Sequence, residues 1–174
     1  MRVYLDTEFA QFMQPHLISL GLAAEDDREF YAVMNNFPRQ QCSEFVREVV
    51  LPIIEDWPGV ALDRREMREA LNQWLHLSSE PTEIVCDFAT DAELLIDLIG
   101  GETEHVLRNF NISCVTVLLV GEYEQLAAAV DRYFTEPRQW PRHHALEDAR
   151  ALRHAYAAFR LTAAAETGKV QHAR

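Results

Sequence analysis

The sequence is poor in cysteine and has no long apolar run. Its three cysteines, Cys42, Cys86 and Cys114, lie far apart, which excludes a disulfide framework and a clustered zinc site and favours reduced thiols in a cytoplasmic protein. No apolar stretch approaches the roughly 20 residues that a membrane-spanning helix needs. The opening residues, MRVYLDTEF, include two acidic side chains, so a secretory signal peptide is not expected.

Basic side chains are also scarce. The chain has 16 Lys and Arg against 28 Asp and Glu, a formal charge of −12, and Lys169 is its only lysine. A protein that coats duplex DNA through charge alone should be basic, so that class is excluded. An acidic nucleic-acid enzyme is not excluded, because bound metal ions neutralise carboxylates. The arginine bias suits bidentate phosphate binding, and the base composition of the coding DNA explains it equally well.

The length of 174 residues, against about 150 per domain, predicts a single domain over 1–174 with a frayed tail after Ala165. Short apolar runs predict strands at 2–5, 17–24, 29–34 and 83–86, and a fifth strand or a helix start at 114–120. Apolar residues at helical spacing predict helices near 43–54, 64–77, 91–99, 123–134 and 144–162. This order predicts an α/β fold, with helices packed against a mixed sheet.

Helix boundaries are predicted from single residues. Asp63 is expected to cap the helix that starts at Arg64, and Thr90 or Asp91 the helix that follows the fourth strand. Pro52 is expected to end or kink the first helix, because proline lacks the backbone N–H that a helix interior uses.

Acidic side chains gather at the ends of three predicted elements. Asp6 and Glu8 close the first strand, where residues two apart point the same way. Asp91 opens a helix after the fourth strand, and His143 and Asp148 flank the start of the last helix. Carboxylates suit Mg²⁺ or Mn²⁺, and four of them can hold two cations about 4 Å apart that clamp a phosphodiester. With a histidine to take a proton from water, the set predicts metal-assisted phosphodiester hydrolysis.

Three segments resemble, in order, the motifs of the DEDDh 3′–5′ exonucleases, a group that includes RNase T and oligoribonuclease. Leu5-Asp6-Thr7-Glu8 resembles the first motif, D-x-E. The stretch IVCDFATDAELL at 84–95 is similar to the second, which leads to a single Asp, and HHALEDA at 143–149 is similar to the third, H-x-A-x-x-D-A. The resemblance covers about residues 2–160, and the short chain looks most like the small stand-alone bacterial exoribonucleases of this group.

The resemblance implies an RNase H-like fold with a five-stranded mixed sheet and helices on both sides. It also implies stepwise release of nucleoside 5′-monophosphates from the 3′ end of single-stranded RNA or an overhang, by a homodimer with no membrane association. The implied site has two divalent cations, Mg²⁺ or Mn²⁺, bound by Asp6, Glu8, Asp91 and Asp148, with His143 as general base. Candidate substrate contacts are Thr7, Phe9, Phe12 and Arg142. Phe9 replaces the Thr common in the family, and Phe9 or Phe12 can stack on a base.

Several alternatives stay open from the sequence. Asp87 competes with Asp91 as the metal ligand of the second motif, and His144 competes with His143; motif position favours Asp91 and His143. DNA is an alternative substrate, because a protein reads the 2′-hydroxyl by local geometry. An inactive RNase H-like module that binds metal and a protein partner is a further alternative, although all five motif residues are present.

Overall fold

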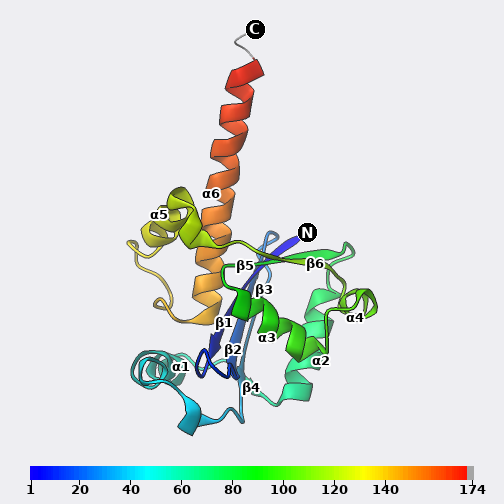
Figure 1. Cartoon of the computed structure of the whole chain (residues 1–174), viewed down its shortest axis with the longest axis vertical. Helices are drawn as coiled ribbons and strands as arrows, with labels where there is room; N and C mark the ends of the chain where they lie inside the picture. The colour runs from blue at the N-terminus through cyan, green and yellow to red at the C-terminus, as the bar shows by residue number, and fades with distance from the viewer. Residues whose placement is uncertain (172–174) are drawn as a thin grey trace.

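A single mixed sheet organises the computed structural model, which describes the backbone of residues 1–171 and the side chains of residues 1–160 (Figure 1). Its six strands lie in the order β4-β3-β2-β1-β5-β6. Their bounds are β1 (Arg2–Phe9), β2 (Leu17–Ala24), β3 (Glu29–Met34), β4 (Val60–Leu62), β5 (Thr82–Cys86) and β6 (Ile112–Val117). The β1/β2 and β2/β3 pairs are antiparallel and the other three pairs are parallel, so β1 lies inside the sheet between β2 and β5.

The expected five-stranded sheet is wrong by one strand. The addition is β4, which pairs with β3 at the edge of the sheet. Three residues are too few to show an alternating pattern, and Val60 is 64% exposed, so the segment carries no core-facing signature. Of the two possibilities expected for 114–120, a strand or a helix start, the structure has the strand, β6, which runs from Ile112 to Val117.

Helices cover both faces of this sheet (Figure 1). Their bounds are α1 (Leu51–Asp56), α2 (Arg64–Leu75), α3 (Ala89–Ile99), α4 (Glu104–Asn109), α5 (Glu124–Tyr133) and α6 (Ala145–Gln171). The short α4 was not expected from the sequence. The backbone past Ala165, expected to be frayed, is helical as far as Gln171, and residues 172–174 lie outside the described part of the chain. Within residues 1–171, no helix is long and apolar enough to cross a membrane.

A capping residue explains where α2 starts, whereas α3 starts without a side-chain cap. Asp63 accepts a hydrogen bond from the Glu66 backbone N–H and donates its own N–H to the Glu66 carboxylate, both at 2.8 Å, which confirms the predicted cap of α2. The cap predicted for α3 is wrong: Phe88 is the N-cap residue, and Asp91 lies inside the first turn. This shift frees the Asp91 side chain for contacts outside its own helix.

Alternation along β1 assigns its side chains to opposite faces of the sheet. Val3 and Leu5 belong to the core that also contains α2 and α3. Tyr4 belongs to the core formed with α5 and α6. Continuing this alternation places Asp6 and Glu8 on the α6 side and Thr7 on the α3 side. The strand therefore ends with polar side chains directed toward the first turns of two different helices.

Gly21 allows α6 to pack unusually close to the sheet. It lies on β2 directly opposite Asp6 of β1. A Cβ atom at this position would overlap backbone atoms of Ala145 and Leu146, at the start of α6. The start of α6 thus rests on a glycine beside the end of β1.

We expect Gly21→Ala to destabilise the fold by about 1–3 kcal/mol, because the overlapping atoms are backbone and cannot move aside as a side chain would. Thermal unfolding measures this effect. Gly121→Ala is the matched control, since a Cβ there meets nothing within 4 Å among the described residues. Equal melting temperatures for the two variants would contradict the close contact.

Candidate functional site

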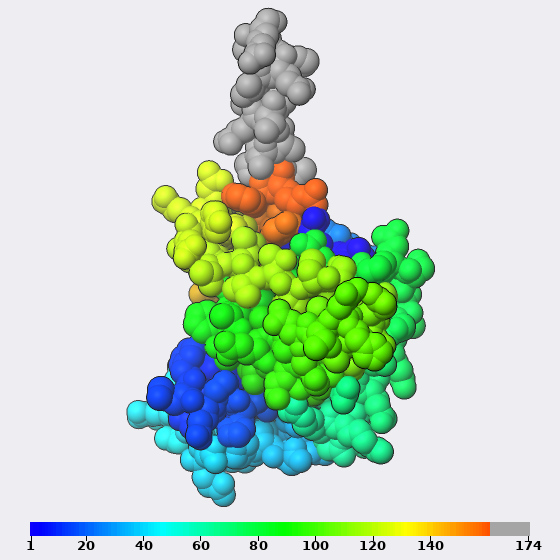
Figure 2. All heavy atoms as spheres, turned by 45° about the vertical axis from the view of Figure 1, so that its right-hand side comes forward, coloured from blue at the N-terminus to red at the C-terminus, as the bar shows by residue number. Residues whose placement is uncertain are grey.

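One cleft of about 650 Å³ gathers the predicted site residues at the carboxyl ends of β1 and β5. Its lining includes all nine of them: Asp6, Thr7, Glu8, Phe9, Phe12, Asp91, Arg142, His143 and Asp148. Figure 2 shows the segment after β1 (blue) at the surface between α1 (cyan) and α3 (green). Parallel neighbours such as β1 and β5 end at the same edge of a sheet, so this location follows from the topology.

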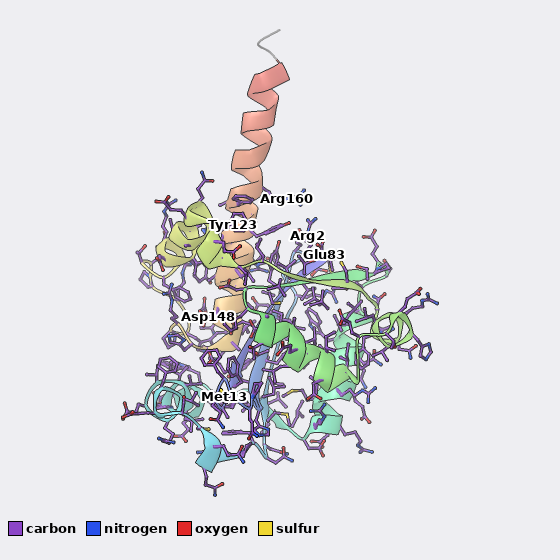
Figure 3. All side chains as sticks on the ribbon, viewed as in Figure 1. Arg2, Met13, Glu83, Tyr123, Asp148 and Arg160 are labelled. Atoms are coloured by element: carbon purple, nitrogen blue, oxygen red, sulfur yellow. The ribbon has the colours of Figure 1, made fainter. Side chains whose placement is uncertain are left out.

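The start of α6 brings the third motif to the end of β1. Asp148 lies near this end of the helix (Figure 3). One ligand atom each from Glu8, His143 and Asp148 lies within 4.8 Å of the other two. This spacing lets a single metal ion contact all three side chains after small adjustments. Asp6 and Asp91 line the same cleft.

Burial raises the pKa of all four carboxyl groups. For Asp6 and Glu8 the pKa lies well above its usual value, first through burial and then through repulsion from Asp91 and Asp148. Burial likewise raises the pKa of Asp91 to about 6 and that of Asp148 to about 7. Arg142, the one arginine among the described lining residues, pairs with Asp131 at 2.8 Å. Among the described residues, acidic groups without a basic partner are therefore concentrated in this cleft, an arrangement that suits a cation.

The hydrogen bonds of Asp91 and Asp87 distinguish these two candidate ligands of the second motif. The buried Thr7 hydroxyl donates to Asp91 Oδ1 at 2.6 Å, which fixes this carboxylate beside the other three. Asp87 also lines the cleft, but its Oδ1 accepts the Val120 backbone N–H at 2.7 Å. Asp87 thus holds the loop after β6, and the geometry favours Asp91. Thr7, predicted as a substrate contact, is placed to orient Asp91.

We expect Thr7→Val to weaken Mn²⁺ binding about 10–100-fold, because second-sphere hydrogen bonds orient metal ligands. Losing this bond also raises the Asp91 pKa further, since the Thr7 hydroxyl now lowers it. Thr7→Ser keeps the hydroxyl and is the matched control. Calorimetric titration with Mn²⁺ measures both variants, and wild-type affinity in Thr7→Val would contradict this role.

The two neighbouring histidines have different surroundings. His143 lines the cleft, half-buried, with its ring edge-on to Phe45 at 5.0 Å. Its backbone N–H donates to Asp148 Oδ2 at 2.7 Å, and burial lowers the pKa of its imidazole, which favours the neutral form. His144 is fully buried among aromatic side chains and is not part of the lining. Of these two histidines, only His143 is therefore placed to accept a proton in the cleft.

Phenylalanine side chains form one wall of the cleft. Phe12 meets Phe9 and Phe88 edge-on, with ring centroids 5.1 and 5.8 Å apart. Phe12 is 71% exposed and Phe88 47% exposed. We refer to Phe9, Phe12 and Phe88 as the aromatic wall. Phe88 and Phe45 were not predicted as site residues, because an apolar residue next to a strand or on a helix is normally assigned to the core.

Comparison with known proteins gives a partial match. No protein-family model matches the chain. The chain is similar to proteins named 3′-5′ exoribonuclease from two strains of Mycobacterium tuberculosis, CDC 1551 / Oshkosh and H37Rv, each 38% identical over 80 residues. The matched region covers 44% of this chain and 47% of each relative, so the chain spans about half the length of the curated relatives it matches.

Proposed function

We propose that the protein is a metal-dependent 3′–5′ exoribonuclease of the DEDDh type, with an RNase H-like fold. The observation that carries this proposal is the convergence of Asp6, Glu8, Asp91, Asp148 and His143 in one cleft. The name of the mycobacterial relatives, 3′-5′ exoribonuclease, supports the reaction and favours RNA as the substrate. The six-stranded mixed sheet with helices on both faces supports the fold assignment.

The donor set fits two Mg²⁺ or Mn²⁺ ions. The four carboxyl groups repel one another, and the cleft's arginine is already paired with Asp131. Asp6, Glu8, Asp91 and Asp148 would hold the ions through hard oxygen atoms. When bound, such ions stabilise the charge that develops on the phosphate and acidify the attacking water.

The chain's own residues then divide the remaining tasks. The neutral His143 imidazole takes the proton from the attacking water, which a general base with a pKa near or below neutrality does well. Thr7 keeps Asp91 oriented, and the His143 backbone N–H holds Asp148. The leaving 3′-oxygen belongs to the shortened RNA, so each cycle releases one nucleoside 5′-monophosphate.

The aromatic wall is suited to hold the end of a single strand. Base stacking on an aromatic ring contributes about 1–3 kcal/mol and does not depend on which base is present. The exposed face of Phe12 offers such a platform next to the carboxylates. Arg142, at the same cleft, can exchange Asp131 for a phosphate oxygen. Together these contacts suit a short footprint at an RNA terminus.

A digestion panel tests the proposed function. Matched RNA and DNA oligomers, linear or circular and with a 3′-hydroxyl or a 3′-phosphate, are incubated with Mg²⁺, Mn²⁺ or EDTA. We expect mononucleotides from the first time points, only from linear RNA with a free 3′-hydroxyl, and no product in EDTA. Early internal fragments would indicate an endonuclease. Full activity after exhaustive chelation would refute the metal requirement, and faster digestion of DNA would reassign the substrate.

Stability should respond to pH and metal together. The folded pKa of Asp148 is about 7, above its unfolded value near 3.9, so its protonated form favours the folded state. This contribution is lost as pH rises toward 7 and beyond, and Asp6 and Glu8 act in the same direction. We therefore expect metal-free protein to melt at a lower temperature at about pH 8 than at about pH 6.5.

Metal should reverse this trend, because it binds the ionised carboxylates of the folded state. Scanning calorimetry at both pH values, with EDTA or with Mn²⁺, measures the effect. We expect the larger Mn²⁺-induced rise in melting temperature at the higher pH. The lower pH equals the usual histidine pKa near 6.5, so His143 and His144, whose pKa burial lowers, oppose this trend in part. We expect the carboxyl groups of Asp6, Glu8 and Asp148 together to outweigh them. A metal-free melting temperature that rises with pH would contradict this account of the cleft.

A further inference from the structure

A stack of side chains surrounds the residue next to His143. The fully buried His144 ring lies parallel to Trp140, with ring centroids 4.4 Å apart and planes 9° apart. It also meets Tyr31, with centroids 4.2 Å apart. The Arg150 guanidinium packs over the Trp140 ring, 4.6 Å from its centroid. We refer to Tyr31, His144, Trp140 and Arg150 as the stacked column.

The stacked column ties the segment before α6 to the sheet. Tyr31 belongs to β3, and Arg150 donates to both Glu29 carboxylate oxygens on the same strand, at 2.7 and 2.6 Å. Arg150 also donates to Glu147 at 2.9 Å. A guanidinium with several charge-assisted bonds keeps a fixed position. Trp140 and His144 are therefore held between β3 and the first turns of α6.

His143 itself has few contacts that could fix its direction. Its ring meets Phe45 edge-on, and its backbone N–H reaches Asp148. Its backbone has φ of +69°, in the left-handed region that side-chain-bearing residues rarely adopt. Such a conformation persists only where the surrounding structure imposes it. The immobilised neighbour, His144, is the part of that structure directly bonded to His143.

We propose that His144 is a positioning residue: the stacked column fixes the backbone at 143–144 and so keeps the His143 imidazole beside Glu8 and Asp148. This inference rests on the proposed function, in which His143 is the proton acceptor. Neither His144 ring nitrogen makes a hydrogen bond of ordinary geometry to a described residue. The flat shape of the ring and its stacking carry the role, so we expect a phenylalanine ring to replace it.

A double-mutant cycle tests the proposal through the reaction. We expect His144→Ala to lower kcat about 10–100-fold, as small misplacements of a catalytic group do, with KM and Mn²⁺ affinity near wild type. His144→Phe should recover most of that loss. In a His143→Ala background, His144→Ala should cost nothing more, because the imidazole that it positions is already absent. A further loss in the double variant would overturn the proposal. The exposed His105→Ala is the control.

A second measurement does not require activity. In spectra of histidine-labelled protein, the Phe45 ring current shifts the His143 imidazole protons, and His143→Ala identifies their signal. We expect this signal to move in His144→Ala and to stay in place in His144→Phe. An unmoved signal in His144→Ala overturns the positioning role. Absence of nuclease activity in the wild type would instead overturn the proposed function, and the spectra would still decide this inference.

Trp140→Leu provides the same test from the other side of the column, in case His144→Ala does not fold. Trp140 is only partly buried, so its loss removes the stacking partner of His144 without emptying the core. We expect the same fall in kcat and the same movement of the His143 signal. Wild-type values for both would count against the column as the positioning element.

Discussion

Asp91→Asn should abolish activity and weaken metal binding together, because it removes a ligand and its charge from the cleft. Asp91 is 3% exposed, and the Thr7 hydroxyl orients it toward the carboxylates of the other two motifs. An amide in its place leaves one neutral oxygen at a position where a divalent cation needs a charged one. Single-turnover rates and Mn²⁺ titrations measure the two effects on the same samples.

Asp87→Asn is the matched control, since it makes the same chemical change four residues earlier in the same cleft. An asparagine can still accept the Val120 N–H through its side-chain oxygen, so we expect a milder loss of activity. The pKa of Asp87 is raised by burial, and this variant should therefore be at least as stable as the wild type without metal. A dead Asp87→Asn beside an active Asp91→Asn would mean that the ligand of the second motif is Asp87.

His143→Ala should lower the single-turnover rate about 10²–10⁴-fold, the usual contribution of a general base. The carboxylates remain, so Mn²⁺ affinity should stay close to that of the wild type. This separation of rate from metal binding distinguishes a proton acceptor from a metal ligand. Loss of Mn²⁺ binding in His143→Ala in proportion to the rate would assign the imidazole to the metal, which its position within 4.8 Å of Glu8 and Asp148 also allows.

The pH profile of the wild type gives an independent check on His143. Burial lowers the pKa of its imidazole from 6.5, so activity should rise as pH increases through this lowered value. Asp148, with a pKa of about 7, must also lose its proton before metal binds. At saturating metal the need to deprotonate Asp148 has less effect on the rate. The fall in activity at acidic pH that remains should then disappear in His143→Ala.

Local sequence patterns predicted the parts of the fold that depend on neighbouring residues. The strands at 17–24 and 29–34 follow from apolar content and alternation, and the α2 cap follows from Asp63 and Glu66. The first strand was predicted too short, because its apolar run ends at Asp6, although the structure continues β1 to Phe9. β4 and α4 are short, and their sequences carry no clear period.

The site was predictable as a set of residues but not as a set of contacts. Motif order gave the four carboxylates and His143 as candidates, and one cleft contains all of them. The role of Thr7 could not be derived, because it depends on which helix covers the opposite face of β1. His144 likewise acquires its surroundings from Tyr31, a residue of a distant strand. Long-range pairs of this kind are set by tertiary packing, which one sequence does not encode in any local period.

Gly21, the residue opposite Asp6, affects the width of the cleft. Donor atoms are usually sought among residues with functional groups, yet the separation between β1 and α6 depends on a position that has no side chain. Any larger residue at 21 would lift the helix that carries Asp148 away from the strand that carries Asp6 and Glu8. Gly21 therefore sets the distance between β1 and α6, and the width available to the cations proposed for this cleft depends on it as much as on the carboxylates.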